Sequence, residues 1–277
     1  MTCFELKKYI SEKLAAASGE LSDYETSLFM EKLCGFSRAE LLMHMHEEAH
    51  FDAELLENMI SRRTKGEPAE YILGETVFFD MRIKLSPDCL IPRADTEFVC
   101  EKALSLMPEN ARVADLCTGS GCIAIALAGH GHARVKAYDI SAGAIKQAKE
   151  NAIRNDVSER VSFFVADVKN DILEGEYDII ISNPPYIKTA EIASLGAGIS
   201  YEPYAALDGG SDGMDFYRAI LSYAPKHLKK GGKIVFEIGY DEENDIKKLA
   251  AEHGLCHDVF RDYGGNPRAA VIYRKGE

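Results

Sequence analysis

The tetrapeptide Asn183-Pro184-Pro185-Tyr186 carries groups that could hold a planar NH2 group. It follows an apolar run at 177–182, which we expect to be a buried strand, because proline cannot donate to a sheet ladder and ends it. Asn183 offers a side-chain carbonyl, Pro184 a backbone carbonyl, and Tyr186 a flat apolar face. Two adjacent carbonyls would orient an amide or exocyclic amine for attack without a strong base. The alternative is a plain Asn-Pro turn after the strand.

A glycine-rich turn follows an expected strand at 111–116 and opens an expected helix. Its residues are Cys117, Thr118, Gly119, Ser120 and Gly121. Glycines let the backbone approach a ligand, and a helix N-terminus supplies free N–H groups. The next expected strand, 135–139, ends in Asp139, where a carboxylate could accept hydrogen bonds from two ribose hydroxyls. The turn also fits the dinucleotide pattern Gly-x-Gly-x-x-Ala, so it suits NAD or an adenosyl donor alike.

The apolar runs further along the chain predict a mostly parallel sheet, because strands and helices alternate. The expected strands lie at 161–167, 177–182 and 232–238, and the expected helices at 142–155 and 215–228. The tail differs, since the runs at 256–260 and 269–273 are joined by a turn without a helix and predict an antiparallel hairpin. This order resembles the α/β, Rossmann-like class I fold of S-adenosylmethionine-dependent methyltransferases. A dinucleotide-binding domain would have a sixth parallel strand instead.

The order of these motifs resembles an amino-group methyltransferase, and their flanks resemble the protein-(glutamine-N5) methyltransferase family that acts on peptide release factors. The flanking motifs are Pro68-Ala69-Glu70-Tyr71-Ile72-Leu73-Gly74, Leu90-Ile91-Pro92-Arg93 with Thr96-Glu97, Tyr201-Glu202-Pro203 with Ala206-Leu207, and Glu237-Ile238-Gly239. The resemblance covers essentially the whole chain. It implies methyl transfer from S-adenosylmethionine to the glutamine side-chain amide of the Gly-Gly-Gln motif of release factors, which supports translation termination.

The resemblance also implies roles for individual residues. It places the backbone of 117–121 around the methionine part of the donor, Asp139 on the ribose, and Asp167 and Val168 along the adenine. It places Asn183 between donor and substrate. The residues implied to grip the glutamine amide are Pro184, Pro185 and Tyr186, and the catalytic group consists of Asn183, Pro184 and Tyr186. No metal is implied.

The sequence departs from the family pattern at four places. Cys117 stands where glycine is commoner, and Ala94-Asp95 where Pro-Glu is usual. Val168 stands where a larger side chain can stack on adenine, and 241–243 stand where a glutamine often follows Glu-Ile-Gly. None of these changes removes a chemical group that the reaction needs.

Residues 4 to about 65 predict a small bundle of helices, which we expect to hold the substrate for the catalytic part. Apolar residues recur there at helical spacing, and Ser22 begins a capping-box pattern that ends at Glu25. We expect a helical substrate-recognition domain at 1–66, a linking β-hairpin at 67–90 and the methyltransferase domain at 91–277. The hairpin follows from two short alternating stretches within 76–85.

The composition limits which binding partners and which cellular location we expect. The formal net charge of -13 disfavours phosphate backbones, so we expect no stable binding to nucleic acid, while a basic protein partner is permitted. The seven cysteines are scattered without a Cys-x-x-Cys pair, which is typical of reduced thiols. The sequence shows no export leader and no bilayer-spanning apolar run, so we expect a cytoplasmic protein that has no membrane partner.

Several alternatives stay open at this point. A DNA or RNA amino-methyltransferase would use the same Asn-Pro-Pro-Tyr site but needs a basic face. An NAD-dependent oxidoreductase conflicts with the terminal hairpin, and only an assay excludes a catalytically silent donor-binding module. The run 46–50 fits the zinc motif His-Glu-x-x-His but lacks a third ligand and a long helix. The residues without an assigned role are His44, His46, His50, Arg93, Glu202, Asp208 and Asp212.

Overall fold

The chain divides into two units in a computed structural model that describes residues 1–18 and 23–276. The first unit is Met1–Gly74 with Gly196–Tyr201, and the second is Glu75–Leu195 with Glu202–Glu277. The chain therefore returns to the first unit for six residues before it completes the second. Each unit has a hydrophobic core of its own.

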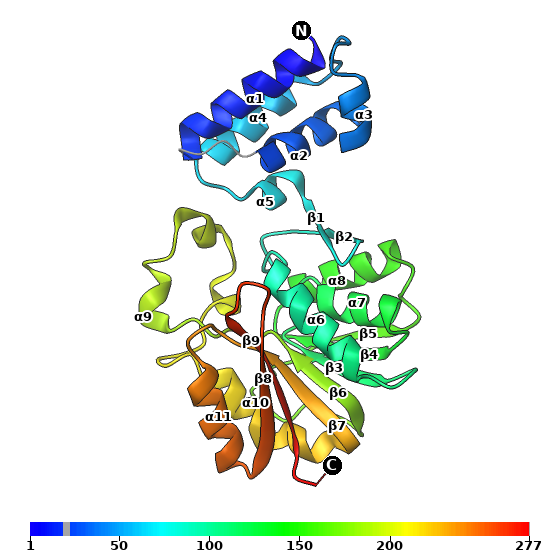
Figure 1. The fold of residues 1–277 in the computed structure, drawn as a ribbon, viewed down its shortest axis with the longest axis vertical. Coiled ribbons are helices and arrows are strands. Elements are labelled where there is room, and N and C mark those ends of the chain that lie inside the picture. The colour runs from blue at the N-terminus through cyan, green and yellow to red at the C-terminus, as the bar shows by residue number, and fades with distance from the viewer. Residues whose placement is uncertain (19–22, 277) are drawn as a thin grey trace. The chain divides into compact units, whose positions relative to one another are not determined.

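The first unit is helical, as the sequence predicts (Figure 1). Its helices are α1 (Cys3–Ser18), α2 (Asp23–Cys34), α3 (Arg38–Met43), α4 (Ala53–Thr64) and α5 (Ala69–Leu73). Two caps explain where helices begin. Ser37 and Glu40 form a capping box at α3, and the carboxylate of Asp52 accepts the N–H groups of Glu54 and Leu55 in the first turn of α4. Ser22, the expected cap of α2, lies outside the described residues. The core residues, which recur three to four positions apart, are Leu6, Ile10, Phe29, Met30, Leu33, Leu56, Met59 and Ile60.

The short helix α5 was not predicted from the sequence. Pro68 precedes it, and Gly74 ends it in the left-handed conformation at φ 76°. Its five residues are too few to show a helical period, so the sequence pattern does not predict a helix there.

The second unit contains a sheet of seven described strands with the order β5-β4-β3-β6-β7-β9-β8 (Figure 1). Its strands are β3 (Arg112–Leu116), β4 (Arg134–Asp139), β5 (Val161–Val165), β6 (Tyr177–Ser182), β7 (Leu228–Glu237), β8 (Leu255–Arg261) and β9 (Pro267–Arg274). The first five are parallel, and β9 runs antiparallel to both β7 and β8. The predicted fold class, a mostly parallel sheet with a terminal antiparallel hairpin, is confirmed.

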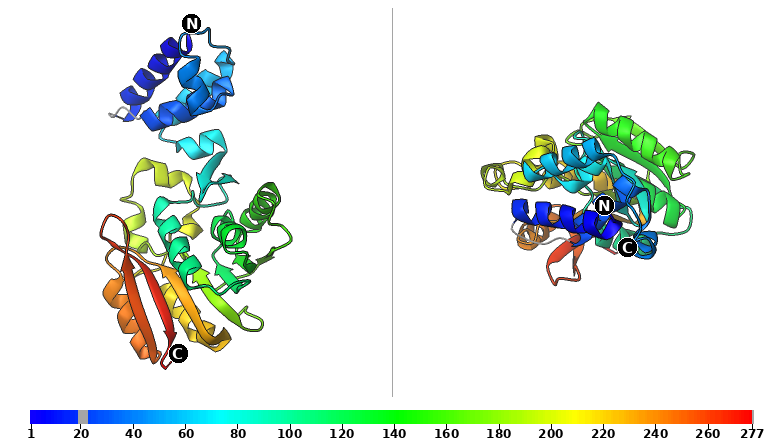
Figure 2. Two further views of the ribbon diagram at one scale, coloured as in Figure 1. Left: turned by 45° about the vertical axis from the view of Figure 1, so that its right-hand side comes forward. Right: turned by 90° about the horizontal axis from the view of Figure 1, so that it is seen from above.

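Two layers of helices cover the sheet, as Figures 1 and 2 show. One layer consists of α6 (Ala94–Leu106), α7 (Cys122–His130) and α8 (Ala142–Arg154), and the other contains α10 (Asp215–Tyr223) and α11 (Glu243–Glu252). The sequence predicted α10 as far as residue 228, but it ends at Tyr223 and a 3-10 turn follows. The core under α10 and α11 is aromatic and aliphatic, and Tyr217 meets Phe236 edge to face at 5.2 Å.

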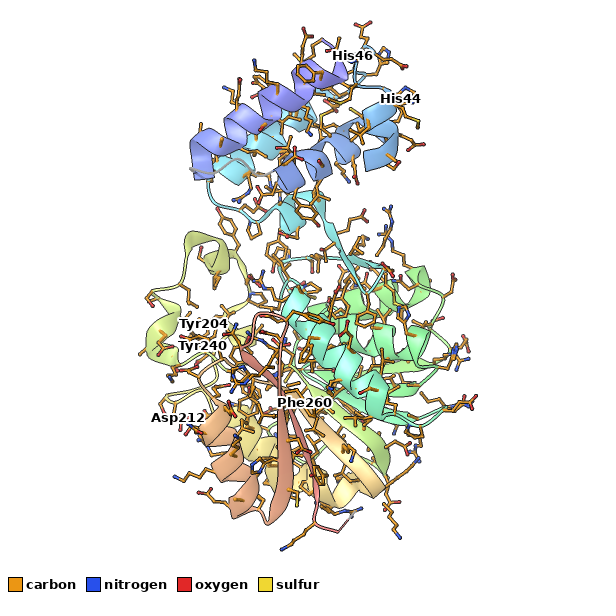
Figure 3. All side chains as sticks on the ribbon, in the orientation of Figure 1. His44, His46, Tyr204, Asp212, Tyr240 and Phe260 are labelled. Carbon is orange, nitrogen blue, oxygen red and sulfur yellow. The ribbon has the colours of Figure 1, made fainter. Side chains whose placement is uncertain are left out.

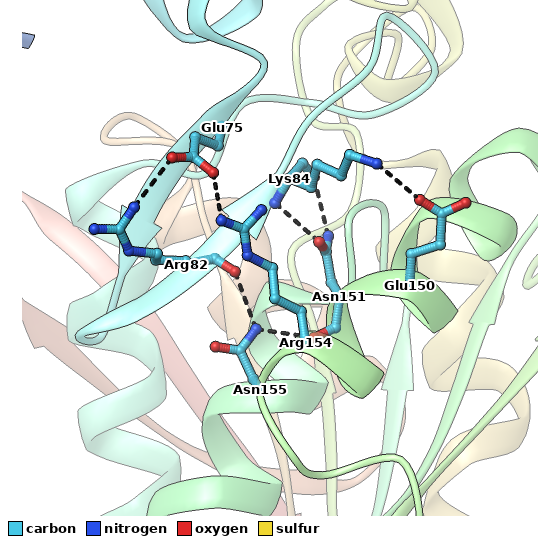
Figure 4. Close-up of polar contacts among 7 residues, drawn as sticks. All are labelled: Glu75, Arg82, Lys84, Glu150, Asn151, Arg154 and Asn155. Carbon is cyan, nitrogen blue, oxygen red and sulfur yellow. Dashed lines mark hydrogen bonds and ion pairs between the residues drawn. The ribbon is translucent and has the colours of Figure 1, made fainter. Parts of the chain in front are cut away.

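A small hairpin, β1 (Glu75–Phe78) and β2 (Met81–Lys84), packs on α8 (Figure 4). Asn151 of α8 is fully buried and makes three hydrogen bonds. It accepts from the backbone N–H of Lys84 at 2.8 Å and donates to the carbonyls of Lys84 and Ser120 at 3.0 and 2.9 Å. Glu75 adds an ion pair with Arg154 at 2.6 Å. The hairpin is thereby fixed to the helix that supports the glycine-rich turn.

No helix within residues 1–18 and 23–276 is long and apolar enough to cross a bilayer.

Candidate active site

The second unit has a cavity of about 430 Å³ at the carboxyl ends of its parallel strands. The strand order reverses between β3 and β6, and ligands of open α/β sheets bind at such a switch point. Of the residues predicted for the site, those that line the cavity are Cys117, Thr118, Gly119, Ser120, Asp139, Asp167, Val168, Asn183 and Pro185. Gly121, Pro184 and Tyr186 lie outside this lining. The structure therefore brings together motifs that are far apart in the sequence.

The turn after β3 has a backbone that only small residues adopt easily. Cys117, Gly119 and Gly121 have φ angles of 63°, 53° and 82°, all in the left-handed region. A Cβ atom on Gly121 would lie 2.9 Å from the Cβ of Ala148 in α8, so glycine is required there. Cys117 adopts the same conformation at a small cost, which explains why glycine would be easier at this position.

Asp139 closes the turn from the neighbouring strand. Its Oδ2 accepts the backbone N–H of Gly119 at 2.8 Å, and its Oδ1 accepts that of Ser141 at 2.9 Å. Burial raises the pKa of Asp139 above its ordinary value, while these amide donors oppose the shift. A carboxylate has about four lone-pair positions, so it keeps acceptor capacity for a hydroxyl donor in the cavity.

Asp167 and Val168 line the cavity from the loop after β5. The sequence predicted a strand through Asp167, but β5 ends at Val165. The reason is local: the carboxylate of Asp167 accepts the N–H of Lys169 at 3.0 Å, which turns the chain off the sheet. Val168 is 4% exposed, and its carbonyl accepts from the hydroxyl of Tyr223 at 2.8 Å.

The Asn-Pro-Pro-Tyr segment follows β6 directly, because β6 ends at Ser182 as predicted. Asn183 Nδ2 donates to Thr96 Oγ1 at 3.2 Å, and the hydroxyl of Tyr186 donates to Glu237 Oε1 at 3.4 Å. Behind the segment, a Cβ on Gly209 would lie 2.7 Å from the Cα of Tyr186, so the returning chain packs directly on its backbone.

The sequence assigns no individual role to Thr96 or Glu237, but the structure places both beside Asn183 or Tyr186. Thr96 lines the cavity, and its hydroxyl donates to Glu237 Oε2 at 2.7 Å. Glu237 is 1% exposed, and burial raises its pKa to about 7. Both residues belong to motifs that carry the family resemblance, which was the available signal.

Arg93 and Glu202 form an ion pair across two segments that line the cavity. Glu202 is 6% exposed, and its Oε2 also accepts the N–H of Ile91 at 3.2 Å. Arg93 is thus a partner of a buried carboxylate rather than part of a surface salt bridge.

The two acids of the following loop differ. Asp208 lines the cavity and accepts from Thr189 Oγ1 at 2.6 Å, which helps to hold its pKa below the ordinary range. Asp212 pairs with Arg218 at 2.9 Å outside the cavity lining, and Arg218 lowers its pKa to about 2 (Figure 3). Thr189 begins α9 (Thr189–Ile192), a single turn that was not predicted from the sequence.

His44 and His46 lie in the turn after α3 (Figure 3), and His50 follows in the connection to α4. His44 stacks on Phe36 at 4.8 Å and meets Glu47 at 2.8 Å. Among residues 1–18 and 23–276 no group of three or more His, Cys, Asp and Glu side chains is placed to hold a metal ion.

The seven cysteines all lie in the described part of the chain, and no two of them form a disulfide there. Cys89, Cys117 and Cys122 line the cavity. Burial raises the pKa of Cys89 and of Cys122 to about 12 and that of Cys117 above its ordinary value. These thiols are therefore protonated near neutral pH and are poor nucleophiles.

Comparisons with known proteins agree with this geometry. The chain matches the family model of the Methyltransferase small domain at residues 97–198 and that of the PrmC N-terminal domain at 5–74. It is 38% identical to a release factor glutamine methyltransferase of Moorella thermoacetica over 96% of both chains. It is also 38% identical to one of Geobacter sulfurreducens, over 88% of this chain and 86% of that one. A methyltransferase structure from Pyrococcus furiosus is similar with a TM-score of 0.56 and 22% identity, over 72% of this chain and 91% of that one.

The sheet order, the glycine-rich turn and the cavity at the strand ends define a class I methyltransferase, whose methyl donor is S-adenosylmethionine. The cavity residues fit that donor, since they offer the backbone of the glycine-rich turn, the carboxylate of Asp139 and the apolar side chain of Val168. At the level of sequence the assignment is narrower. The chain belongs to the release factor glutamine methyltransferase family.

Proposed function

We propose that this protein methylates the glutamine side-chain amide of the Gly-Gly-Gln motif in peptide chain release factors, with S-adenosylmethionine as the methyl donor. The observation that carries the proposal is that Asn183 and the turn after β3 line one cavity. An amine acceptor and a donor molecule would meet there. The family of the chain supports glutamine as the acceptor.

The proposed mechanism depends on positioning. The side-chain carbonyl of Asn183 and the backbone carbonyl of Pro184 accept the two hydrogens of the glutamine NH2 group, and Tyr186 packs on the amide plane. The donor supplies an activated methyl group, so alignment of the amide nitrogen lowers the barrier without a strong base. The proton leaves to water after transfer. The thiols of Cys89 and Cys122 in the cavity are protonated and take no part in the methyl transfer.

The remaining assignments follow from the same function. We assign substrate recognition to the helical region at 1–66, a linking role to 67–90 and catalysis to 91–277. The structural division at Gly74 and the domain match at 5–74 support a separate N-terminal part. A cytoplasmic location agrees with a substrate that acts in translation, and the net charge of -13 disfavours stable nucleic-acid binding.

Mass spectrometry of a release factor incubated with the protein and S-adenosylmethionine tests the proposal. We expect one added methyl group on the Gly-Gly-Gln glutamine and none on a Gly-Gly-Ala control. DNA and RNA samples are run alongside. A methyl group found only on nucleic acid would favour an amino-group methyltransferase of nucleic acids, which would use the same Asn-Pro-Pro-Tyr site.

A further inference from the structure

A chain of hydrogen bonds runs from a buried carboxylate to the side chain of Asn183. Glu237 Oε2 accepts from Thr96 Oγ1 at 2.7 Å, and Thr96 Oγ1 accepts from Asn183 Nδ2 at 3.2 Å. Glu237 and Thr96 are 1% and 2% exposed, so water does not compete for these bonds. The second oxygen of Glu237 accepts from Tyr186 at 3.4 Å. One carboxylate thus contacts, directly or through Thr96, both ends of the Asn-Pro-Pro-Tyr segment.

The count of hydrogens determines which way the Asn183 amide points. An ionised carboxylate only accepts, and a threonine hydroxyl has a single hydrogen. That hydrogen is used on Glu237, so the oxygen of Thr96 can only accept from Asn183. The NH2 group of Asn183 must therefore face Thr96, and its carbonyl oxygen must face away from it.

We propose that Glu237 and Thr96 are positioning residues that set the amide orientation of Asn183 and so keep its carbonyl available to the substrate amide. The inference rests on the proposed function, because it takes an NH2 group as the acceptor. With the Asn183 amide reversed, its own NH2 group would face the substrate NH2 group, and two donors would oppose each other.

The charge state of Glu237 decides whether this orientation holds. The titratable and charged groups that act on it are Asp95 and Cys100 of α6, Cys122 of α7, Tyr186, Tyr217 of α10 and Arg268 of β9. Arg268 is the sole cation among them, and it pairs with Asp95 at 3.1 Å and Asp262 at 3.3 Å. Arg268 is therefore shared among several carboxylates and only partly stabilises the ionised form of Glu237.

Protonation of Glu237 would release the constraint. Burial raises its pKa to about 7, and the hydrogen bonds from Thr96 and Tyr186 and the charge of Arg268 oppose the shift. A protonated Oε2 donates to Thr96, whose hydroxyl hydrogen is then free to donate to the Asn183 carbonyl in the reversed amide. The productive orientation belongs to the ionised form, so turnover rises as the pH increases through about 7.

Two variants of Thr96 distinguish the role of its hydroxyl group from the role of its side-chain packing. Thr96→Val keeps the shape and removes the hydroxyl, whereas Thr96→Ser keeps the hydroxyl. We expect Thr96→Val to lower kcat on a release factor by about 10- to 100-fold, the worth of one strong hydrogen bond, with the Kd for S-adenosylmethionine within about 2-fold. Thr96→Ser should restore most of that loss. Equal kcat in Thr96→Val and wild type would overturn the inference.

The pH profile supplies a readout that a packing role would not change. Wild-type kcat should show an ascending limb near pH 7, and this limb should be absent in Thr96→Val. Glu237→Gln imitates the protonated form, so its activity should stay low and flat with pH, and the double variant should lose no more than Glu237→Gln alone. If the two single losses in kcat multiply in the double variant, or if the ascending limb persists in Thr96→Val, the inference that Glu237 acts on Asn183 through Thr96 is wrong. Thr96→Val carries the test if Glu237→Gln fails to fold.

An NMR measurement makes the inference independent of the substrate. The side-chain NH2 signals of Asn183, assigned by their loss in Asn183→Ala, should shift in Thr96→Val and titrate with Glu237 in the wild type. Unchanged Asn183 signals would overturn the inference that Glu237 and Thr96 orient Asn183, even if the release factor is methylated. If the signals respond but no release factor is methylated, the proposed function is wrong, whereas the hydrogen-bond chain from Glu237 to Asn183 is confirmed.

Discussion

The backbone N–H of Gly119 donates to Oδ2 of Asp139 at 2.8 Å and so joins the turn after β3 to the end of β4. The carboxylate that is predicted to hold the ribose is therefore also part of the frame of the turn. Its geometry is set before any ligand arrives, which lowers the ordering cost of binding.

Asp139→Ala should weaken donor binding. The variant loses the acceptor for ribose hydroxyls and the tie to Gly119, and we expect the Kd for S-adenosylmethionine to rise about 10- to 100-fold, or about 1.4–3 kcal/mol. Isothermal titration calorimetry measures the change. Glu159→Ala, at an exposed site away from the cavity, is the control. An unchanged Kd would remove Asp139 from the donor site.

Asn183→Ala should abolish turnover while donor binding persists. The side chain is predicted to hold the substrate amide in line, so we expect kcat to fall at least about 100-fold with the Kd for the donor within about 3-fold. Single-turnover methylation and calorimetry measure the two quantities. Loss of both together would count against a role in positioning the substrate.

Arg93→Ala should destabilise the protein more than removal of an exposed pair. It removes the guanidinium from the buried Glu202, which keeps the hydrogen bond from Ile91, and we expect a loss of about 2 kcal/mol in the free energy of unfolding. Arg82→Ala is the matched control, because its pair with Glu75 is more exposed and should be worth less than about 1 kcal/mol. Urea denaturation compares them, and equal losses would contradict the argument.

Glu242→Gln should stabilise the protein in alkaline solution. Glu242 is 4% exposed, and one of its carboxylate oxygens has no hydrogen-bond partner among residues 1–18 and 23–276. Burial raises its pKa to about 7 from an ordinary value of 4.5. The folded state therefore binds the proton more tightly, and the stability that this proton gives is lost as the pH rises through about 7. Ionisation costs about 3 kcal/mol above that pH, and an unpaired amide NH2 group in the variant costs about 1 kcal/mol.

We accordingly expect the Glu242→Gln variant to exceed wild type by about 2 kcal/mol in unfolding free energy at pH 8, with the gain gone near pH 5. Chemical denaturation at the two pH values measures it. A variant that is less stable than wild type at pH 8 would show that the glutamate gains more from its contacts than it loses by burial.

Local patterns predicted much of the fold because their causes are local. The bounds of β6 follow from an apolar run that ends at a proline, and the terminal hairpin follows from two alternating runs around a turn. The single-turn helix α9 gave no period to detect, and β5 ended early because Asp167 bonds to its own loop. Such side-chain bonds compete with the ladder and leave no mark on hydrophobic periodicity.

The cavity motifs were also predictable, since each consists of adjacent residues with a definite chemistry. The partners that hold them were not. Thr96 and Glu237 are 141 positions apart and Arg93 and Glu202 are 109 apart, and no local pattern joins them. Only packing of the strands and of α6 brings these side chains together. The sequence therefore predicts the groups that meet the ligands better than the groups that orient them.

The place of β9 in the sheet has a consequence for how the protein is made. β9 lies between β7 and β8, and the positive charge of its Arg268 acts on Glu237. During synthesis the edge of β7 therefore stays uncovered until residues 267–274 have left the ribosome, although every cavity motif has emerged by then. A nascent chain would hold the whole set of site residues yet lack the strand that completes their surroundings, so methylation should begin only after β9 has emerged and paired with β7.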